Sequence, residues 1–270
     1  MRPGCINVTN IWIDPVGVES AAGRIASIIS ERDTERENGG TNKLAYVCTP
    51  DAGSAAYVCT PNAEIMMEAQ KDAPFMRILN EASLVVPDGA GVVLAARILG
   101  YGRIPRTPGY DLALKLLMNP SEYSFSYYFL GGRPGTAEKA AENIVARSPL
   151  TRIAGCRDGY FSEGDEPDVI ESINNSGADL LFVALGAPKA EKWIYKNRAK
   201  LRPAVCMGVG GTLDTLAGVT RLAPPFFRAH GIEWLYRLAR QPWRAKRMLR
   251  LPQYVLFTIW WKLRGRPAAR

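Results

Sequence analysis

The stretch Leu180-Leu181-Phe182-Val183-Ala184-Leu185, followed by the turn Gly186-Ala187-Pro188-Lys189, decides the fold class of this chain. The run is apolar throughout and does not alternate with polar residues, as expected for a parallel strand that helices cover on both faces. The same pattern of an apolar run and then a turn recurs at residues 56–59, 84–86, 127–130 and 205–209. The sequence therefore predicts an α/β fold, with a doubly wound, mostly parallel sheet and helices on both faces.

The composition is that of a folded protein and excludes the disordered and fibrous classes, since 47% of the 270 residues are hydrophobic and 22% are charged. The longest strongly apolar run, residues 254–261, is far shorter than the roughly 20 residues that span a bilayer. Residues 1–12 also lack the pattern of a signal peptide, so we expect no segment that crosses a membrane. Five cysteines without a CxxC pair and a single histidine favour a reducing cytoplasm and argue against a zinc site.

Positive charge is concentrated at one end of the chain. The formal net charge is +8, and residues 221–270 contain 12 of the 34 basic residues but a single acidic residue, Glu233. We expect an α/β body over 1–219 and a basic, helical, membrane-associating appendage over 220–270. Arginines interleaved with Trp and Phe are typical of a helix that lies in the headgroup layer of an anionic membrane. An ordinary C-terminal helical subdomain with its aromatic residues in a core is the alternative.

Ligands of doubly wound folds bind beyond the carboxyl ends of the strands, so the residues directly after each run are the candidate site. Glycine-rich turns that lead into helix N-termini offer backbone N–H groups to phosphate, although glycine also serves in tight turns without any ligand. The turns in question contain Thr60 and Asn62, Pro87-Asp88-Gly89, Gly131-Gly132, Gly186 to Lys189, and Gly208 to Asp214. Neither GxGxxG nor GxxxxGK[ST] occurs.

An internal duplication complicates the first of these turns. The sequence Ala-Tyr-Val-Cys-Thr-Pro at residues 45–50 recurs at residues 56–61, and one copy alone can occupy the strand position. The second copy precedes a convincing helix, so we assign Thr60 and Asn62 to the site.

Asp88 is the acidic residue of greatest interest, because Pro87 fixes the turn before it and Gly89 allows close approach. An aspartate in this position is either a general base or a turn or helix cap. No D-x-D motif signals a carboxylate pair that would hold Mg²⁺ against a nucleotide diphosphate. Arginines would then have to neutralise a diphosphate, and the basic end of the chain supplies them.

Several motifs in order resemble those of the WecG/TagA/CpsF glycosyltransferases over roughly residues 5–250. They are Thr60-Pro61-Asn62-Ala63-Glu64, Pro87-Asp88-Gly89-x-Gly91-Val92-Val93, Pro108-Gly109-x-Asp111-Leu112, Leu130-Gly131-Gly132-x-Pro134-Gly135, Gly159-Tyr160-Phe161, Gly186-x-Pro188-Lys189-x-Glu191-Lys192-Trp193, Gly208-Val209-Gly210 through Asp214, and Glu233-Trp234-Leu235-Tyr236-Arg237.

This resemblance implies an inverting, metal-independent transferase that needs no cofactor and sits peripherally at the cytoplasmic face of the cell membrane. It would move N-acetylmannosamine, or a related hexose or uronic acid, from UDP to a polyprenyl-diphosphate-linked sugar in cell-envelope or exopolysaccharide biosynthesis. Its partners would be these two substrates and an anionic membrane surface, without nucleic acid, and homo-oligomerisation is left open.

Carried over position by position, the resemblance makes Asp88 the catalytic base, with Thr60 as a second catalytic residue. The implied substrate-binding residues are Asn62, Arg106, Gly131, Gly132, Tyr160, Gly186, Lys189, Ala190, Glu191, Asp214, Arg237, Arg244 and Arg247. Ala190 departs from the family pattern, which usually has glutamine there, and this difference bears on donor choice.

Two other functional classes remain as alternatives. One is a nucleic-acid-binding protein that uses the basic end of the chain, with binding that weakens steeply as salt is added. The other is a dinucleotide-dependent oxidoreductase built on Gly208-Val209-Gly210-Gly211, which lacks the remaining fingerprint glycine and an evident ribose-binding acid.

Overall fold

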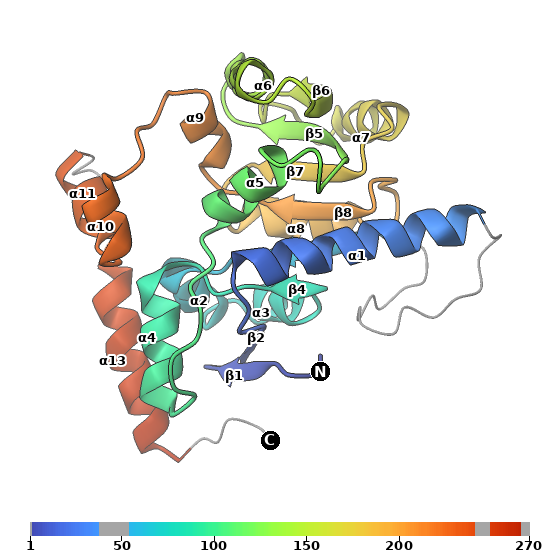
Figure 1. The fold of residues 1–270 in the computed structure, drawn as a ribbon. Helices are drawn as coiled ribbons and strands as arrows, with labels where there is room; N and C mark the ends of the chain where they lie inside the picture. The colour runs from blue at the N-terminus through green and yellow to red at the C-terminus, as the bar shows by residue number, and fades with distance from the viewer. Residues whose placement is uncertain (1, 38–53, 241–248, 266–270) are drawn as a thin grey trace.

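The computed structural model describes residues 2–37, 54–240 and 249–265. Its centre is a six-stranded sheet in the order β4-β3-β8-β7-β5-β6 (Figure 1), and every neighbouring pair in it is parallel. The strands are β3 (Ala56–Cys59), β4 (Leu84–Val85), β5 (Ser126–Gly131), β6 (Arg152–Arg157), β7 (Leu180–Ala184) and β8 (Val205–Gly208). The predicted α/β class is confirmed.

Helices cover both faces of this sheet, because successive residues of each strand point to opposite sides. In β3, Ala56 and Val58 join one buried cluster, whereas Tyr57 and Cys59 join the other. The first cluster is closed by α1 (Val18–Glu37), α5 (Gly109–Leu117), α6 (Thr136–Arg147) and α9 (Thr212–Leu216). The second is closed by α2 (Ala63–Ala69), α3 (Ala73–Asn80), α4 (Gly89–Leu99), α7 (Glu166–Asn175) and α8 (Lys189–Asn197).

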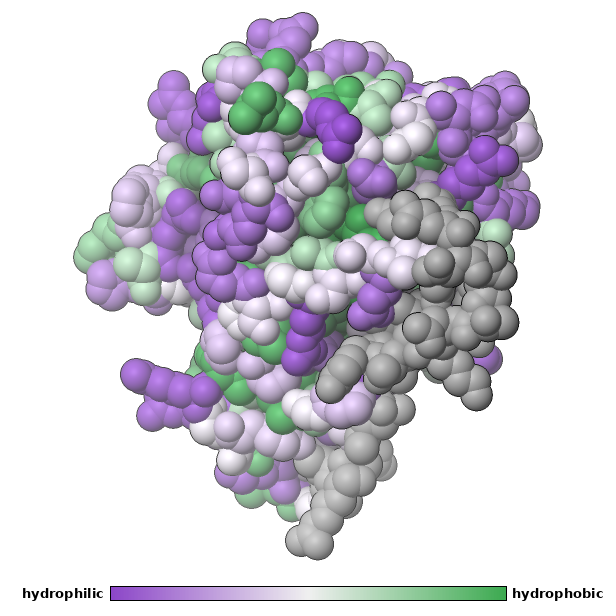
Figure 2. Space-filling model, turned by 45° about the vertical axis from the view of Figure 1, so that its right-hand side comes forward, coloured by the Kyte–Doolittle hydropathy of each residue, from purple (hydrophilic) through white to green (hydrophobic). Residues whose placement is uncertain are grey.

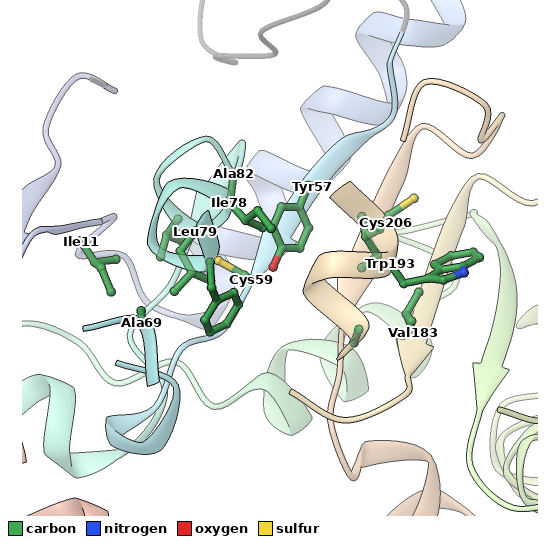
Figure 3. Packing of buried hydrophobic residues seen from close by; sticks show 14 of the residues in the cluster. Ile11, Tyr57, Cys59, Ala69, Ile78, Leu79, Ala82, Val183, Trp193 and Cys206 are labelled. Carbon is green, nitrogen blue, oxygen red and sulfur yellow. The ribbon is translucent and has the colours of Figure 1, made fainter. Parts of the chain in front are cut away.

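The second cluster joins the two halves of the sheet. Figure 3 shows Tyr57 of β3 beside Ile78 of α3, and Trp193 of α8 close to Val183 of β7. Tyr57 and Val183 are fully buried, so α3 and α8 are held to the sheet by apolar packing. The candidate site is built on the carboxyl ends of these strands.

The free edge of β4 is covered by the N-terminal hairpin of β1 (Ile6–Val8) and β2 (Ile11–Ile13). Asp14 follows this hairpin and is almost fully buried. Its backbone N–H donates to the carbonyl of Val85 (2.7 Å), and its carboxylate accepts from the N–H of Val85 (2.8 Å) and from Arg2 Nε (3.0 Å). A buried carboxylate paired in this way ties the end of β4 in place, three residues before Asp88.

Four of the predicted strands agree with the structure to within one residue at each end, and β3 agrees at both ends. Strand β6 was not predicted from the sequence. It lies at the edge of the sheet, starts and ends with arginine and is only partly buried, so it lacks the continuous apolar run of a central strand.

The C-terminal segment contains three described helices, α10 (Pro225–Ala229), α11 (Glu233–Arg240) and α13 (Arg250–Leu263). Helix α13 runs alongside α4 and also contacts α2 (Figure 1). Tyr254 and Trp261 are buried there, Arg250 pairs with Glu68 at 3.1 Å, and the hydroxyl of Tyr254 lies 3.2 Å from Thr9 Oγ1. The predicted appendage over 220–270 therefore includes a helix that packs on the α/β body.

No helix within the described ranges is long and apolar enough to cross a membrane. The face of the molecule shown in Figure 2 is mainly hydrophilic, with hydrophobic residues in small scattered groups. The first copy of the duplicated segment, residues 45–50, lies outside the described residues, while the second copy forms β3 and the start of the turn after it.

Candidate active site

The carboxyl ends of the six parallel strands meet at one edge of the sheet and carry most of the predicted site residues. Thr60 follows β3, Asp88 follows β4, Gly131 ends β5 and Gly186 follows β7. Tyr160 follows β6, and Asp214 lies in the first turn of α9 after β8. The strand-end rule of doubly wound sheets thus brings together residues that are up to 154 positions apart in the chain.

Thr60 lies against Gly109, and Asn62 lies against Gly89, both in neighbouring turns. A Cβ atom on Gly109 would lie 2.8 Å from Thr60 Oγ1, so only glycine allows α5 to begin this close to Thr60. Asn62 caps α2, and its Oδ1 accepts from the N–H groups of Glu64 (3.0 Å) and Ile65 (3.1 Å). This amide oxygen is therefore occupied by its own helix.

Asp88 stands at the N-cap position of α4 but does not act as a cap. Its backbone is extended, and its side chain makes no capping hydrogen bond. The backbone N–H of Asp88 donates to the carbonyl of Pro61 (3.2 Å), and Thr107 N–H donates to Pro87 (2.8 Å), so both neighbouring turns hold this one. The interpretation of this aspartate as a cap of α4 is therefore wrong, while its role as a general base stays a prediction. A half-buried carboxylate remains at the positive end of the α4 dipole.

The turns after β5 and β6 are packed so tightly that glycine is required. A Cβ atom on Gly131, where φ is +128°, would lie 2.5 Å from the backbone of Ala184. The N–H of Gly159 donates to the carbonyl of Gly132 (2.9 Å), and that of Gly132 donates to Ala184 (3.3 Å). These contacts pack the backbone of the turns together between Asp158 and Gly186, and we call this surface the glycine wall. Tyr160 is 71% exposed at its edge.

Lys189 and Phe161 meet at the same wall. The ammonium of Lys189 lies 5.8 Å from the centroid of the Phe161 ring, and this ring packs edge-on against Trp193 at 6.3 Å. A cation over an aromatic face is favourable, so Phe161 restrains Lys189 near the turn after β6. Sequence reasoning gave Phe161 no role, although it stands within the quoted Gly159-Tyr160-Phe161 motif.

Ala190 and Glu191 differ from the expectation that they touch the substrate. The first turn of α8 faces the sheet, so Ala190 is 1% exposed and Glu191 is 5% exposed. Burial raises the pKa of the Glu191 carboxyl to about 7. Both side chains lie on the face of α8 that packs against the sheet, so they are buried below the strand ends and do not line the open edge.

The predicted arginines fall into two groups. Arg106 uses its guanidinium to contact the C-terminal segment, with Nη1 2.9 Å from Glu233 Oε1 and Nη2 donating to the carbonyl of Arg228 at 2.9 Å. Arg237 lies in α11, but its side chain is outside the description, and Arg244 and Arg247 fall in the undescribed range 241–248.

Within the described ranges, no group of three or more His, Cys, Asp and Glu side chains is arranged to hold a metal ion. The edge instead offers backbone N–H groups, the N-termini of α4, α6 and α8, and basic side chains such as Lys189. Those groups are suited to an anionic phosphate ester.

A carboxylate at one turn and closely packed glycine turns at the others are typical of the ligand-binding edge of a doubly wound α/β protein. The chain belongs to the glycosyl transferase WecG/TagA/CpsF family, whose model matches residues 40–268. The chain is 36% identical over 194 residues to an N-acetylglucosaminyldiphosphoundecaprenol N-acetyl-beta-D-mannosaminyltransferase of Bacillus spizizenii, covering 72% of this chain and 75% of the relative. It is 34% identical over 198 residues to the Bacillus subtilis protein of the same name, covering 73% of this chain and 77% of that protein.

Proposed function

We propose that this protein transfers N-acetylmannosamine from a UDP donor to an N-acetylglucosamine that is linked through diphosphate to a polyprenol. The names of the two Bacillus relatives support the acceptor and the transferred sugar. The observation that carries the proposal is the position of Asp88. It is a half-buried carboxylate that does not cap its helix, and it lies among the turns that hold Thr60 and Gly109.

In the proposed reaction, a hydroxyl oxygen of the acceptor sugar attacks the anomeric carbon of the donor from the side opposite UDP. The new carbon–oxygen bond forms as the bond to the diphosphate oxygen breaks, and UDP leaves with that electron pair. Asp88 takes the hydroxyl proton, and one displacement of this kind inverts the anomeric centre. The N-terminus of α4 stabilises the carboxylate form of Asp88 before the proton arrives.

The donor would lie along the glycine wall. We assign its diphosphate and sugar to the turns of Gly131, Gly132 and Gly186, with Lys189 as the nearby cation and Tyr160 and Asp214 at the sides. Arg237, Arg244 and Arg247 would neutralise the departing diphosphate, since preorganised positive charge at the leaving group lowers the barrier. Ala190 and Glu191 would act indirectly, because their buried side chains hold the first turn of α8 in place.

We also propose that α13 rests on the inner face of the cell membrane. Its outward side chains include Leu256, Ile259, Trp260 and Leu263, all at least 41% exposed, and Lys262 and Arg264 lie in or just after its last turn. An apolar face with flanking basic groups suits the headgroup layer of an anionic membrane. A polyprenol-linked acceptor is found at such a surface, so this orientation would bring enzyme and acceptor together.

The test is a UDP-release assay with UDP-N-acetylmannosamine, its uronic acid, UDP-glucose and UDP-N-acetylglucosamine, each with a short polyprenyl-diphosphate-linked N-acetylglucosamine. We expect acceptor-dependent UDP release with the first donor and little with the others. Release with another donor alone would overturn the assigned sugar. No release with any donor, together with salt-sensitive binding of RNA, would favour the nucleic-acid-binding alternative.

A further inference from the structure

Four charged side chains join the helices α10 and α11 to the α/β body. From the body come Arg106, in the loop before α5, and Asp111, in the first turn of α5. Arg106 pairs with Glu233 of α11 (2.9 Å), and Asp111 pairs with Arg228 of α10. Arg106 also donates to the backbone carbonyl of Arg228 (2.9 Å), which links the two pairs into one network.

The arrangement of signs makes this four-charge network specific. Each segment contributes one positive and one negative charge, and each charge faces its opposite across the contact. A shifted docking of α10 and α11 would place like charges together, and such juxtaposition is strongly unfavourable. The four side chains are between 25% and 33% exposed, so their interactions are screened by solvent less than those of fully exposed pairs.

Among the described residues, little apolar surface is buried at this contact. No residue of α10 is buried, and among the described side chains of α11 none is buried either. By contrast, α13 buries Tyr254 and Trp261 against the body. Helices α10 and α11 therefore depend on the four-charge network for their placement in a way that α13 does not.

The network lies directly beside the candidate catalytic residues. Asp111 is two positions after Gly109, which abuts Thr60. At the other end, a Cβ atom on Gly231, in the turn between α10 and α11, would lie 2.9 Å from the Cβ of Ala90, two positions after Asp88. Helix α11 starts two residues after that turn, and Arg237 follows about one helical turn later.

We propose that Arg106, Asp111, Arg228 and Glu233 are positioning residues that fix α11, and with it Arg237, beside the turn of Asp88. The role of Arg237 rests on the proposed function, whereas the placement of α11 by these charges does not. Arg106 thereby acts on the reaction through the C-terminal segment. The guanidinium has five N–H donors, and its two bonds to that segment use two of them.

Charge reversal and re-pairing test the proposal. In the full-length protein, Asp111→Arg and Arg228→Asp are made singly and together, and Lys139→Glu with Glu142→Lys serves as the matched pair on the exposed face of α6. Backbone hydrogen exchange over residues 225–240 is measured first, without any substrate. We expect each single reversal at the network to speed this exchange by about tenfold, the size of a coupling within one charge network, and the double reversal to restore it to within about threefold.

Kinetics give the second readout. Each single reversal is expected to lower kcat/KM by about tenfold at an unchanged melting temperature of the body, with recovery in the double variant. The α6 pair should change neither quantity. Exchange over 225–240 that does not respond to the single reversals overturns the proposal. Altered exchange without any change in kcat/KM shows that α11 is placed by the charges but does not serve catalysis, and this overturns the catalytic part alone.

A variant without any charge change gives an independent check. Gly231→Ala pushes the α10–α11 turn away from Ala90, and Gly177→Ala is its control because Gly177 has the same φ of +68° but nothing within 4 Å of its Cβ position. We expect faster exchange over 225–240 and a several-fold lower kcat/KM in Gly231→Ala only. Equal behaviour of the two glycine variants would contradict the close placement of the C-terminal segment against α4.

Discussion

The carboxyl group of Glu191 occupies the space in front of Gly208, where an added Cβ atom would lie 3.2 Å from Oε1. Gly208 ends β8 next to β3, so this acid lies under the middle of the site edge. Its Oε2 accepts no hydrogen bond from any residue that the structure describes. The nearby Tyr57 hydroxyl is also buried and has no hydrogen-bond partner among these residues. The protein thus holds an ionisable side chain in an apolar layer directly beneath its candidate active site.

We predict from this relationship that the contribution of Glu191 to folding stability falls as the pH rises from about 4.5 to about 7. Burial raises the pKa of Glu191 from 4.5 to about 7, so between these values the folded protein binds more protons than the unfolded chain. This acid therefore favours the folded state most below pH 4.5 and loses that contribution up to about pH 7. At about 1.4 kcal/mol for each pKa unit, the loss is about 3–4 kcal/mol.

Urea denaturation of the wild type and of Glu191→Gln at pH 5, 6, 7 and 8 measures this effect. The amide does not titrate, so the variant should lack this part of the pH dependence and exceed the wild type in stability at pH 8. Parallel curves for the two proteins would show that the carboxyl is not held in its neutral form.

Gly208→Ala should destabilise the fold by about 1–2 kcal/mol, as expected when a methyl group is forced into a packed layer. The added Cβ would press on the Glu191 carboxyl, which has little room to move because Glu191 is buried. Thermal unfolding at pH 5 reports the loss. The glycine at position 210 is a suitable comparison, since nothing lies within 4 Å of its Cβ position, although its own φ of +52° carries a separate cost. A melting temperature of Gly208→Ala equal to that of the wild type would refute the tight contact.

Asp88→Asn should lower kcat by roughly 10²–10⁴-fold, the usual contribution of a general base. The fold should remain, because asparagine has nearly the size and shape of aspartate and the substitution removes no capping bond of α4. Calorimetric titration with UDP is the control, and its affinity is expected to stay within a few-fold of the wild-type value. Turnover close to that of the wild type would remove Asp88 from the mechanism.

Transfer should survive EDTA. The chain has no D-x-D motif, and the described residues offer basic groups and backbone N–H donors at the site edge. Assays in excess EDTA, and then with added Mg²⁺ or Mn²⁺, decide the point. Loss of activity that either metal restores would show that a cation neutralises the diphosphate.

Replacement of Leu256 and Leu263 by serine should weaken binding to anionic vesicles by about tenfold or more, since burial of a leucine side chain contributes about 1.5–3 kcal/mol. Both side chains are more than 60% exposed on α13, so the melting temperature should not change. Leu150→Ser is the control, because Leu150 is 75% exposed between α6 and β6. Sedimentation with vesicles measures the binding, and an equal loss in the control would mean that α13 is not the contact.

The continuous apolar runs were sufficient to predict the strands buried on both faces, including β3 at both of its ends. They could not reveal the β1–β2 hairpin, whose strands have three residues each and whose turn places Thr9 and Asn10 at positive φ without a glycine. Hairpin turns of this kind are usually signalled by Asn-Gly or Asp-Gly, and neither dipeptide stands here.

The positions of candidate residues were predictable where they depend on strand ends, as for Thr60 and Asp88. They were not predictable where they depend on side-chain direction or on pairing across the chain. Glu191 points inward because of how α8 begins, and Arg106 finds Glu233 at a distance of 127 positions in the sequence. Such partners are set by tertiary packing, and nothing in the local pattern around either residue indicates the other.

Helix α13 also has a consequence for biosynthesis. It covers α4 and bonds to Thr9 in the N-terminal hairpin, yet about 150 residues separate the end of α4 from the start of α13. At a translation rate of roughly 5–20 residues per second, the surface of α4 waits on the order of ten seconds for its cover. During that interval the surface around Gly91 and Ala63, against which Leu251 later packs, lacks the side chains that cover it in the complete fold.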